Sequence, residues 1–205
     1  MRIIVRALLV AAFGMLCACS KGSNPTEPVQ PDTPAQSCQK GYTAYGTDDF
    51  TGALTYFQKA IQSDASYVYG YEGLGWSYLR LRNFTQADAN FQTALTKNPD
   101  LSTTISLAVG RSSIAIKNND PDTVIQQLAY KIDGTDTWVH RFDPKVTAVT
   151  LHVLLAEAYI MKNTLGSEAG SASNARDAWG QVKKALQLSA SDADALRLQS
   201  YLRGL

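Results

Sequence analysis

The chain has 205 residues, 45% of them hydrophobic and 18% charged, and its 19 basic and 18 acidic side chains give a formal net charge of +1. This length suits one compact domain or a short stack of repeats and argues against two large domains. The balanced charge, without a basic run, argues against a protein that binds nucleic acid by neutralising phosphates. Three cysteines are too few for a disulfide framework.

The first eighteen residues have the pattern of a secretory signal peptide. Arg2 and Arg6 supply positive charge, and a 12-residue apolar run, 7–18, follows them. A helix that spans a bilayer needs about 20 apolar residues, so this run is too short to cross one stably. We therefore expect residues 1–18 to be a cleaved signal peptide.

The end of the apolar run carries a four-residue motif, Leu16-Cys17-Ala18-Cys19. It resembles the lipobox of bacterial lipoproteins, in which the cysteine after a Leu-x-small triplet becomes the lipidated first residue. Cys17 is a competing site, but it would place bulky Leu16 next to the cut, where Ala18 suits Cys19. The resemblance implies acylation of Cys19, and two or more acyl chains hold a protein stably at a bilayer. The alternative is an ordinary signal peptide with incidental cysteines.

Residues 19–37 form the next segment, in which we expect the lipidated cysteine to be followed by a disordered linker. Four of the seven prolines fall here at a spacing of three: Pro25, Pro28, Pro31 and Pro34. Val29 is the only large apolar residue of the segment. Such a segment favours extended conformers and cannot bury a core. We interpret it as a spacer between membrane and folded domain, although the same spacing fits a PxxP ligand.

A periodic pattern of small and large residues begins after the linker. Its clearest copy comprises Tyr71, Leu74, Gly75, Tyr78, Ala87, Phe91, Ala94 and Pro99. Thirty-four residues earlier, Gly41, Phe50, Ala53, Phe57 and Ala60 correspond to Gly75, Phe84, Ala87, Phe91 and Ala94. The pattern resembles the tetratricopeptide repeat, which implies antiparallel helix pairs in which small residues let the backbones approach and large ones fill the spaces.

The pattern weakens after Pro99. Residues 101–117 are expected to form the first helix of a third pair, and Asp120-Pro121 begins a second helix that runs to about Ile132. Residues 133–145 break the period, which predicts a long loop.

A fourth pair follows, with the motifs Leu155-Ala156-x-x-Tyr159 and, after a Gly/Ser/Ala-rich segment at 163–174, Ala178-x-x-x-Val182-x-x-Ala185. We expect Ser191 to cap a last helix that ends near Arg203 and covers the open end of the stack. The predicted fold class is therefore all-α: a tetratricopeptide-like α-solenoid of about four helix pairs over residues 38–205, with a C-terminal capping helix.

The sequence contains no recognisable catalytic or metal-binding motif, so we expect no enzyme, no metal and no cofactor. His152 falls at a packing position of the fourth pair. His140 lies in the long loop with Asp136, Arg141 and Asp143, where an acid–base or metal role is conceivable but weakly signalled by a single histidine. Cys38 is expected to be a buried, inert thiol rather than one that pairs between chains.

The family resemblance implies a concave groove lined by the first helix of each pair. The partner-binding set at its inward positions is Tyr42, Tyr45, Tyr69, Glu72, Trp76, Leu79, Arg80, Arg111 and Glu157. Aromatic and arginine residues are frequent anchors of peptide and protein interfaces. The alternative is that several of the tyrosines pack between repeats; Trp76 is the strongest candidate for exposure. Chaperone-binding members clamp a free C-terminus with Lys and Asn where this chain has Cys38 and Tyr42, which argues against that ligand.

A second candidate surface is the aromatic stretch at 138–142, within the long loop. Two exposed aromatic residues there, Trp138 and Phe142, would suit a partner. Alternatively they fold back onto the third pair and cover its irregular second helix, which is the interpretation that we favour.

These features together predict a lipid-anchored, non-enzymatic scaffold or adaptor that binds another cell-envelope protein. It is similar to tetratricopeptide lipoproteins that serve outer-membrane protein insertion, pilus secretin assembly or peptidoglycan-enzyme recruitment. Ser20 after the lipidated cysteine implies the outer membrane, facing the periplasm. The alternatives are an enzyme accessory or small-molecule binder that uses the 133–145 loop, and a protein that delivers lipid-anchored cargo.

Overall fold

The structure is a computed structural model that describes residues 30–173 and 175–205. The predicted signal peptide, the predicted lipidation site Cys19 and most of the predicted linker lie outside these residues. A compact unit spans Asp32–Leu205. Its described part contains helices and no strand, which confirms the predicted all-α class.

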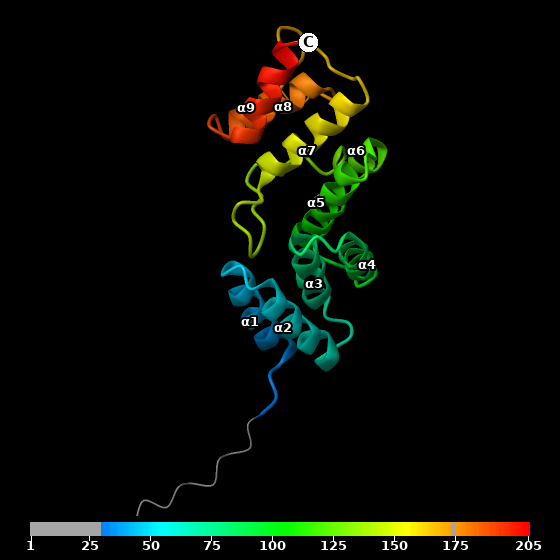
Figure 1. The fold of residues 1–205 in the computed structure, drawn as a ribbon, viewed down its shortest axis with the longest axis vertical. Helices are drawn as coiled ribbons and strands as arrows, with labels where there is room; N and C mark the ends of the chain where they lie inside the picture. Colours follow the sequence, from blue (N-terminus) through cyan, green and yellow to red (C-terminus); the bar gives the residue numbers. More distant parts are fainter. Residues whose placement is uncertain (1–29, 174) are drawn as a thin grey trace, which may run out of the picture. The chain divides into compact units, whose positions relative to one another are not determined.

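The helices follow one another with short connections, apart from two longer loops that precede α7 and α8 (Figure 1). In chain order they are α1 (Pro34–Gly46), α2 (Phe50–Ser63), α3 (Val68–Arg80), α4 (Phe84–Leu95), α5 (Leu101–Lys117), α6 (Pro121–Leu128), α7 (Ala148–Met161), α8 (Ala178–Leu188) and α9 (Ala193–Arg203). None of these described helices has the length and apolar character needed to cross a bilayer.

Side-chain caps explain where most of the helices begin. Every described helix except α3 has a Thr, Asp or Asn at its N-cap whose side-chain oxygen accepts a backbone N–H of the first turn. Asp120 caps α6 with Pro121 at the first helical position, as predicted. The cap of α9 is Asp192, so the prediction of Ser191 was wrong by one residue.

Helix α1 begins inside the segment that we expected to be linker. Thr33 and Gln36 form a capping box, in which each side chain accepts the other's backbone N–H, at 3.2 Å and 2.9 Å. Pro34 occupies the first helical position, where its fixed φ suits the helix. Within the described residues the first helix therefore starts at Pro34, four residues before the expected domain boundary at Cys38.

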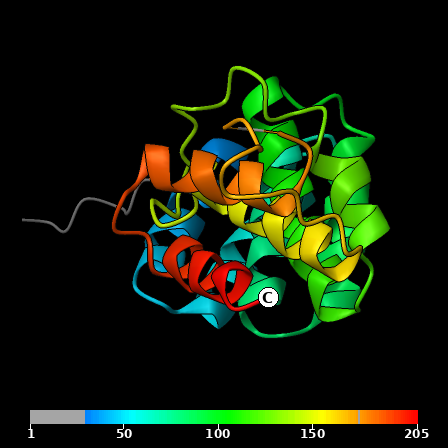
Figure 2. The same cartoon turned by 90° about the horizontal axis from the view of Figure 1, so that it is seen from above.

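Contacts between helices follow a regular scheme. Each odd-numbered helix packs against the next odd-numbered one, which forms a row of α1, α3, α5, α7 and α9. Each even-numbered helix packs against the odd-numbered helices that precede and follow it in the chain. The succession of pairs is seen from blue α1 and α2 to red α9 in Figure 1, and from above in Figure 2.

Two phenylalanines, each inserted between glycines of neighbouring odd helices, hold the first five helices together. Phe57 contacts the positions of Gly41 and Gly73, and Phe91 contacts those of Gly75 and Gly110. A Cβ added at any of these four glycines would overlap the ring, and both rings are fully buried. The predicted opposition of small residues to large rings is thus present at Gly75 and Phe91.

Candidate functional site

A segment of the loop between α6 and α7 lies against the row of odd helices. We call residues 138–143 the strap. Backbone hydrogen bonds join it to the start of α7 and the residues just before that helix: His140 donates to Val146 (2.8 Å), Val146 to Asp143 (3.0 Å) and Ala148 to Trp138 (2.9 Å). In Figure 1 the loop extends from α7 back towards α1. The strap thereby covers helix faces that are distant from it in the sequence.

The aromatic end of the strap packs on α1. The ring of Phe142 stacks on Tyr42, with centroids 4.7 Å apart, and meets Tyr45 edge-on at 5.0 Å. Next to it, the Asp143 carboxylate accepts a hydrogen bond from the Tyr45 hydroxyl (3.3 Å) and pairs with Arg80 (3.4 Å). Burial and the Asp143 charge raise the pKa of Tyr45, which keeps its hydroxyl a donor.

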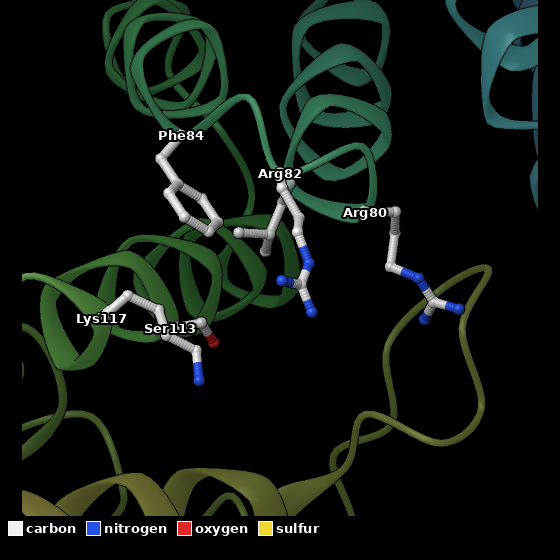
Figure 3. A pocket seen from close by; sticks show the side chains of 6 residues that line it. Arg80, Arg82, Phe84, Ser113 and Lys117 are labelled. Carbon is white, nitrogen blue, oxygen red and sulfur yellow. The ribbon is translucent and has the colours of Figure 1, made fainter.

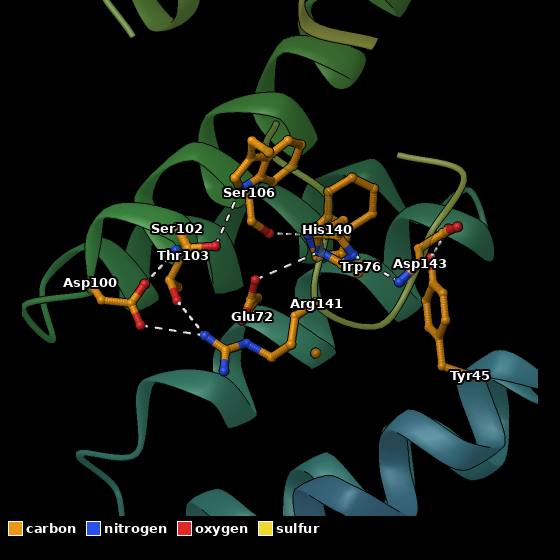
Figure 4. A network of polar contacts seen from close by, with 12 residues as sticks. Tyr45, Glu72, Trp76, Asp100, Ser102, Thr103, Ser106, His140, Arg141 and Asp143 are labelled. Atoms are coloured by element: carbon orange, nitrogen blue, oxygen red, sulfur yellow. Dashed lines mark hydrogen bonds and ion pairs between the residues drawn. The ribbon is translucent and has the colours of Figure 1, made fainter. Parts of the chain in front are cut away.

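The centre of the strap places an imidazole over two buried side chains of α3 (Figure 4). The rings of His140 and Trp76 have centroids 4.5 Å apart, and Nε2 of His140 lies 3.7 Å from Oε1 of Glu72. Burial lowers the pKa of His140 to about 3 and raises that of Glu72 to about 7. His140 is therefore neutral near pH 7, and its contact with Glu72 is not an ion pair.

Hydrogen bonds fix the orientation of this cluster. Nδ1 of His140 accepts the backbone N–H of Asp143 (3.1 Å), which leaves the proton of the neutral ring on Nε2. Trp76 donates from Nε1 to the hydroxyl of Ser106 on α5 (2.9 Å). Nε2 of His140 and Oε2 of Glu72 are buried and have no hydrogen-bond partner among the described residues.

The remaining strap residues tie α3 to the start of α5. The guanidinium of Arg141 lies over the ring of Tyr69 (4.3 Å to its centroid) and pairs with Asp100 (3.4 Å). Tyr69 itself donates its hydroxyl to Asp100 (3.0 Å), and Trp138 donates from Nε1 to Ser102 (3.2 Å). Figure 4 shows the guanidinium of Arg141 directed towards Asp100 and Thr103.

The strap changes how the predicted groove residues are presented. Trp76 is 4% exposed, Glu72 1% and Tyr45 3%, so none of the three is open to a partner as we had expected. The reason is tertiary: the strap fills the face of α1, α3 and α5 on which they lie. Both aromatic residues fold back: Phe142 packs on Tyr42 and Tyr45 of α1, and Trp138 donates to Ser102 of α5, the first helix of the third pair.

The structure separates the other predicted groove residues. Arg111 turns towards α4 and pairs with Asp88 (2.7 Å), away from the remaining set. Glu157 pairs with Arg197 of α9 (2.7 Å) and borders a cleft of about 300 Å³ between α5, α7 and α9. Tyr42 borders a different recess beside Arg141 and Phe142. Leu79 and Arg80 line one open cleft together.

That cleft, which we call the basic cleft, has a volume of about 520 Å³. It lies between the α3–α4 turn and α5, and its lining residues are Leu79, Arg80, Arg82, Phe84, Ser113 and Lys117. Figure 3 shows the three cationic side chains around the same open space. The sequence analysis did not include Arg82, Phe84, Ser113 or Lys117 among the site residues; the available signal was a basic residue in the last turn of two successive odd helices, Arg80 in α3 and Lys117 in α5.

The remaining candidates for chemistry are packed side chains. His152 is buried as predicted, and its Nδ1 lies 2.7 Å from Oε1 of Gln181 on α8. Cys38 is a buried free thiol, and burial raises its pKa to about 12, so it is protonated and weakly nucleophilic near pH 7. Within the described residues no three His, Cys, Asp or Glu side chains are grouped so that they could hold a metal ion.

No protein-family model matches the chain. No curated protein matches its sequence either.

Proposed function

We propose that this chain is a lipid-anchored scaffold or adaptor of the bacterial cell envelope, which binds a segment of another envelope protein along its row of odd helices. The observation that carries the proposal is an open path on that row. The basic cleft and the cleft between α5, α7 and α9 are adjacent, because Lys117 lines both. Apolar and charged side chains border the path, as in peptide-binding grooves.

A tetratricopeptide-like architecture is the fold that we propose for residues 38–205. The 34-residue offset between the two phenylalanine–glycine contacts supports it, since Phe57 and Phe91 are one such offset apart. So does the regular packing of odd helices on odd helices. In this reading α1 to α8 are four pairs, and α9 covers the open end of the last.

The membrane anchor and the location are proposed from the N-terminal sequence. The lipobox-like motif at 16–19 supports acylation of Cys19, and Ser20 supports sorting to the outer membrane, with the domain facing the periplasm. The proline-rich stretch after it supports a spacer between the bilayer and α1.

The alternative site in the 133–145 loop receives less support. His140 is 3% exposed, and its imidazole faces Trp76 and not the solvent, so a substrate has no path to it in this conformation. The aspartate beside it, Asp143, is engaged by Tyr45 and Arg80. We therefore propose a non-enzymatic function, without a cofactor.

Photo-cross-linking in the native membrane tests this proposal. A photoreactive side chain replaces Leu79 or Tyr201 in the two clefts, and Gln58 or Gln92, exposed on α2 and α4, serves as the control position. We expect an envelope protein to be captured from the cleft positions and not from the control positions. Capture of nothing, or equal capture at all four positions, would contradict a docking surface on the odd-numbered row.

A further inference from the structure

We infer that the basic cleft binds an acidic internal segment of a protein partner, with carboxylates at Arg82 and Lys117 and an apolar side chain against Leu79 and Phe84. This inference rests on the proposed adaptor function and adds the chemistry of the ligand. It concerns a site at the α3–α4 turn, away from Cys38 and Tyr42 of α1.

Three segments of the fold bring cations to the cleft. Arg80 ends α3, Arg82 lies in the turn before α4, and Lys117 ends α5. Cations in the last turn of a helix are favoured by the helix dipole, which accounts for the positions of Arg80 and Lys117. Arg82 directly follows Leu81, the C-cap of α3, and faces the same space (Figure 3).

The charges of these three cations are unequally compensated. Arg80 pairs with Asp48 (3.3 Å) and Asp143 (3.4 Å). Arg82 and Lys117 make no ion pair with any residue in the ranges 30–173 and 175–205. Like charges that line one cleft raise the local potential for an anion. The cleft therefore presents two cationic groups available to carboxylates.

The lining also specifies an apolar component. Leu79 and Phe84 are half-buried and line the same cleft as Ser113 and Lys117. A cleft of about 520 Å³ has room for several side chains. The combination of cations with an aliphatic and an aromatic side chain favours a peptide that carries both acidic and apolar residues over a bare inorganic anion.

The surroundings favour a chain segment over a lipid surface. The cations line a recess, whereas the headgroups of a bilayer form a flat layer that does not enter one. The path also continues past Lys117 to Met161 and Tyr201, both of which are exposed in the neighbouring cleft. An extended segment can follow it, with acidic residues at the α3–α4 turn and apolar residues towards α9.

A random peptide array tests the inference with the full chain in neutral detergent micelles. We expect the retained peptides to be enriched in Asp and Glu together with aliphatic or aromatic residues. The variants Arg82→Glu and Lys117→Glu should each lose this enrichment. Lys59→Glu, which makes the same charge change on the exposed surface of α2, should keep it. Enrichment without acidic residues, or equal loss in all three variants, overturns the inference.

Solution binding of a retained peptide gives the size of the effect. Arg82→Glu or Lys117→Glu should weaken it by about tenfold or more, equivalent to roughly 1.4 kcal/mol. Displacement of the peptide by millimolar phosphate, or by phosphatidylglycerol in the micelles, as efficiently as by unlabelled peptide would identify an inorganic-anion or lipid-headgroup site and overturn the inference.

The cross-linking experiment separates this inference from the adaptor function. If Leu79 captures an envelope protein equally well in the Arg82→Glu background, the adaptor function stands and the ligand chemistry is wrong. If acidic peptides bind as described but no envelope protein is captured, the cleft chemistry stands and the adaptor function is wrong.

Discussion

The imidazole of His140 lies over the buried carboxyl group of Glu72, with Nε2 3.7 Å from Oε1. The two groups come from the strap and from α3, 68 positions apart in the chain. Burial moves their pKa values in opposite directions, from 4.5 to about 7 for Glu72 and from 6.5 to about 3 for His140. Both shifts favour the neutral forms, and they have opposite effects on stability as the pH changes.

Replacing Glu72 with Gln should stabilise the protein at alkaline pH. Because the pKa of Glu72 is raised in the folded state, its stabilising contribution to the free energy of unfolding is fully present below pH 4.5 and is lost as the pH rises through about 7. Gln has no such ionisation. We expect urea titration at about pH 8 to give Glu72→Gln a free energy of unfolding higher than that of the wild type by on the order of 2 kcal/mol. At about pH 5 the two free energies should converge.

His140 determines how the same variant responds to acid. The lowered pKa of His140 means that the unfolded chain takes up a proton first, so stability falls as the pH drops from 6.5 towards 3. In the wild type, the stability contributed by protonated Glu72 increases as the pH falls from 6.5 to 4.5 and offsets part of this loss. The Glu72→Gln variant lacks that contribution, so its stability should fall more steeply over the same range. Glu157→Gln, on the half-buried surface of α7, controls for the loss of one carboxylate. Parallel pH curves for wild type and Glu72→Gln would refute a buried, neutral carboxyl group.

Truncation of Phe142 should weaken the strap. Phe142→Ala removes the ring that stacks on Tyr42 and meets Tyr45. We expect a loss of about 2 kcal/mol in the free energy of unfolding, because the ring is only partly buried and aromatic pairs add to its burial. Urea titration measures the loss. Tyr130→Ala, at a side chain that is 75% exposed, should change stability by less than about 0.5 kcal/mol. Equal effects would mean that the strap does not pack on α1.

The contact between Gly75 and Phe91 should tolerate no added methyl group. Gly75→Ala places a Cβ against the fully buried ring, and overpacking of this kind costs typically about 1–3 kcal/mol. Gly46→Ala is the matched control, because no atom lies within 4 Å of the Cβ position there. Thermal unfolding should show a lower midpoint for Gly75→Ala alone. The double variant Gly75→Ala/Phe91→Leu should recover part of the loss; if it recovers none, the ring is not the cause.

Acylation of Cys19 predicts a simple partition experiment. The wild-type protein, expressed in a bacterium that acylates lipoproteins, should enter the detergent-rich phase of a Triton X-114 extraction. Cys19→Ala should move to the aqueous phase, since it has no fatty acyl chain to bury. Cys17→Ala should behave as the wild type. The opposite result, with only Cys17→Ala in the aqueous phase, would place the lipid on the competing cysteine.

The pattern of small and large residues predicted the order of the helices and the packing of each on the next, although α6, expected to run to about Ile132, ends at Leu128. Helix caps and the opposition of Gly75 to Phe91 involve residues within a few turns or one repeat of each other, and the chain encodes them locally. The same local rules failed where a cap had two neighbouring candidates, at Ser191 and Asp192, and where a capping box at Thr33 extended a helix into a proline-rich stretch.

What only the tertiary structure decided is which part of the odd-numbered row remains open. The family resemblance implied that Tyr45, Glu72 and Trp76 lie on an inward face, but no repeat pattern describes the loop that covers them. The strap reaches α1 from 98 positions away, through the contact of Asp143 with Tyr45, and its burial depends on the shape of a surface built from three separate helices. Helix periodicity is a property of neighbouring residues, whereas the packing of an irregular segment depends on the assembled surface, and so the basic cleft became visible only once the helices were in place.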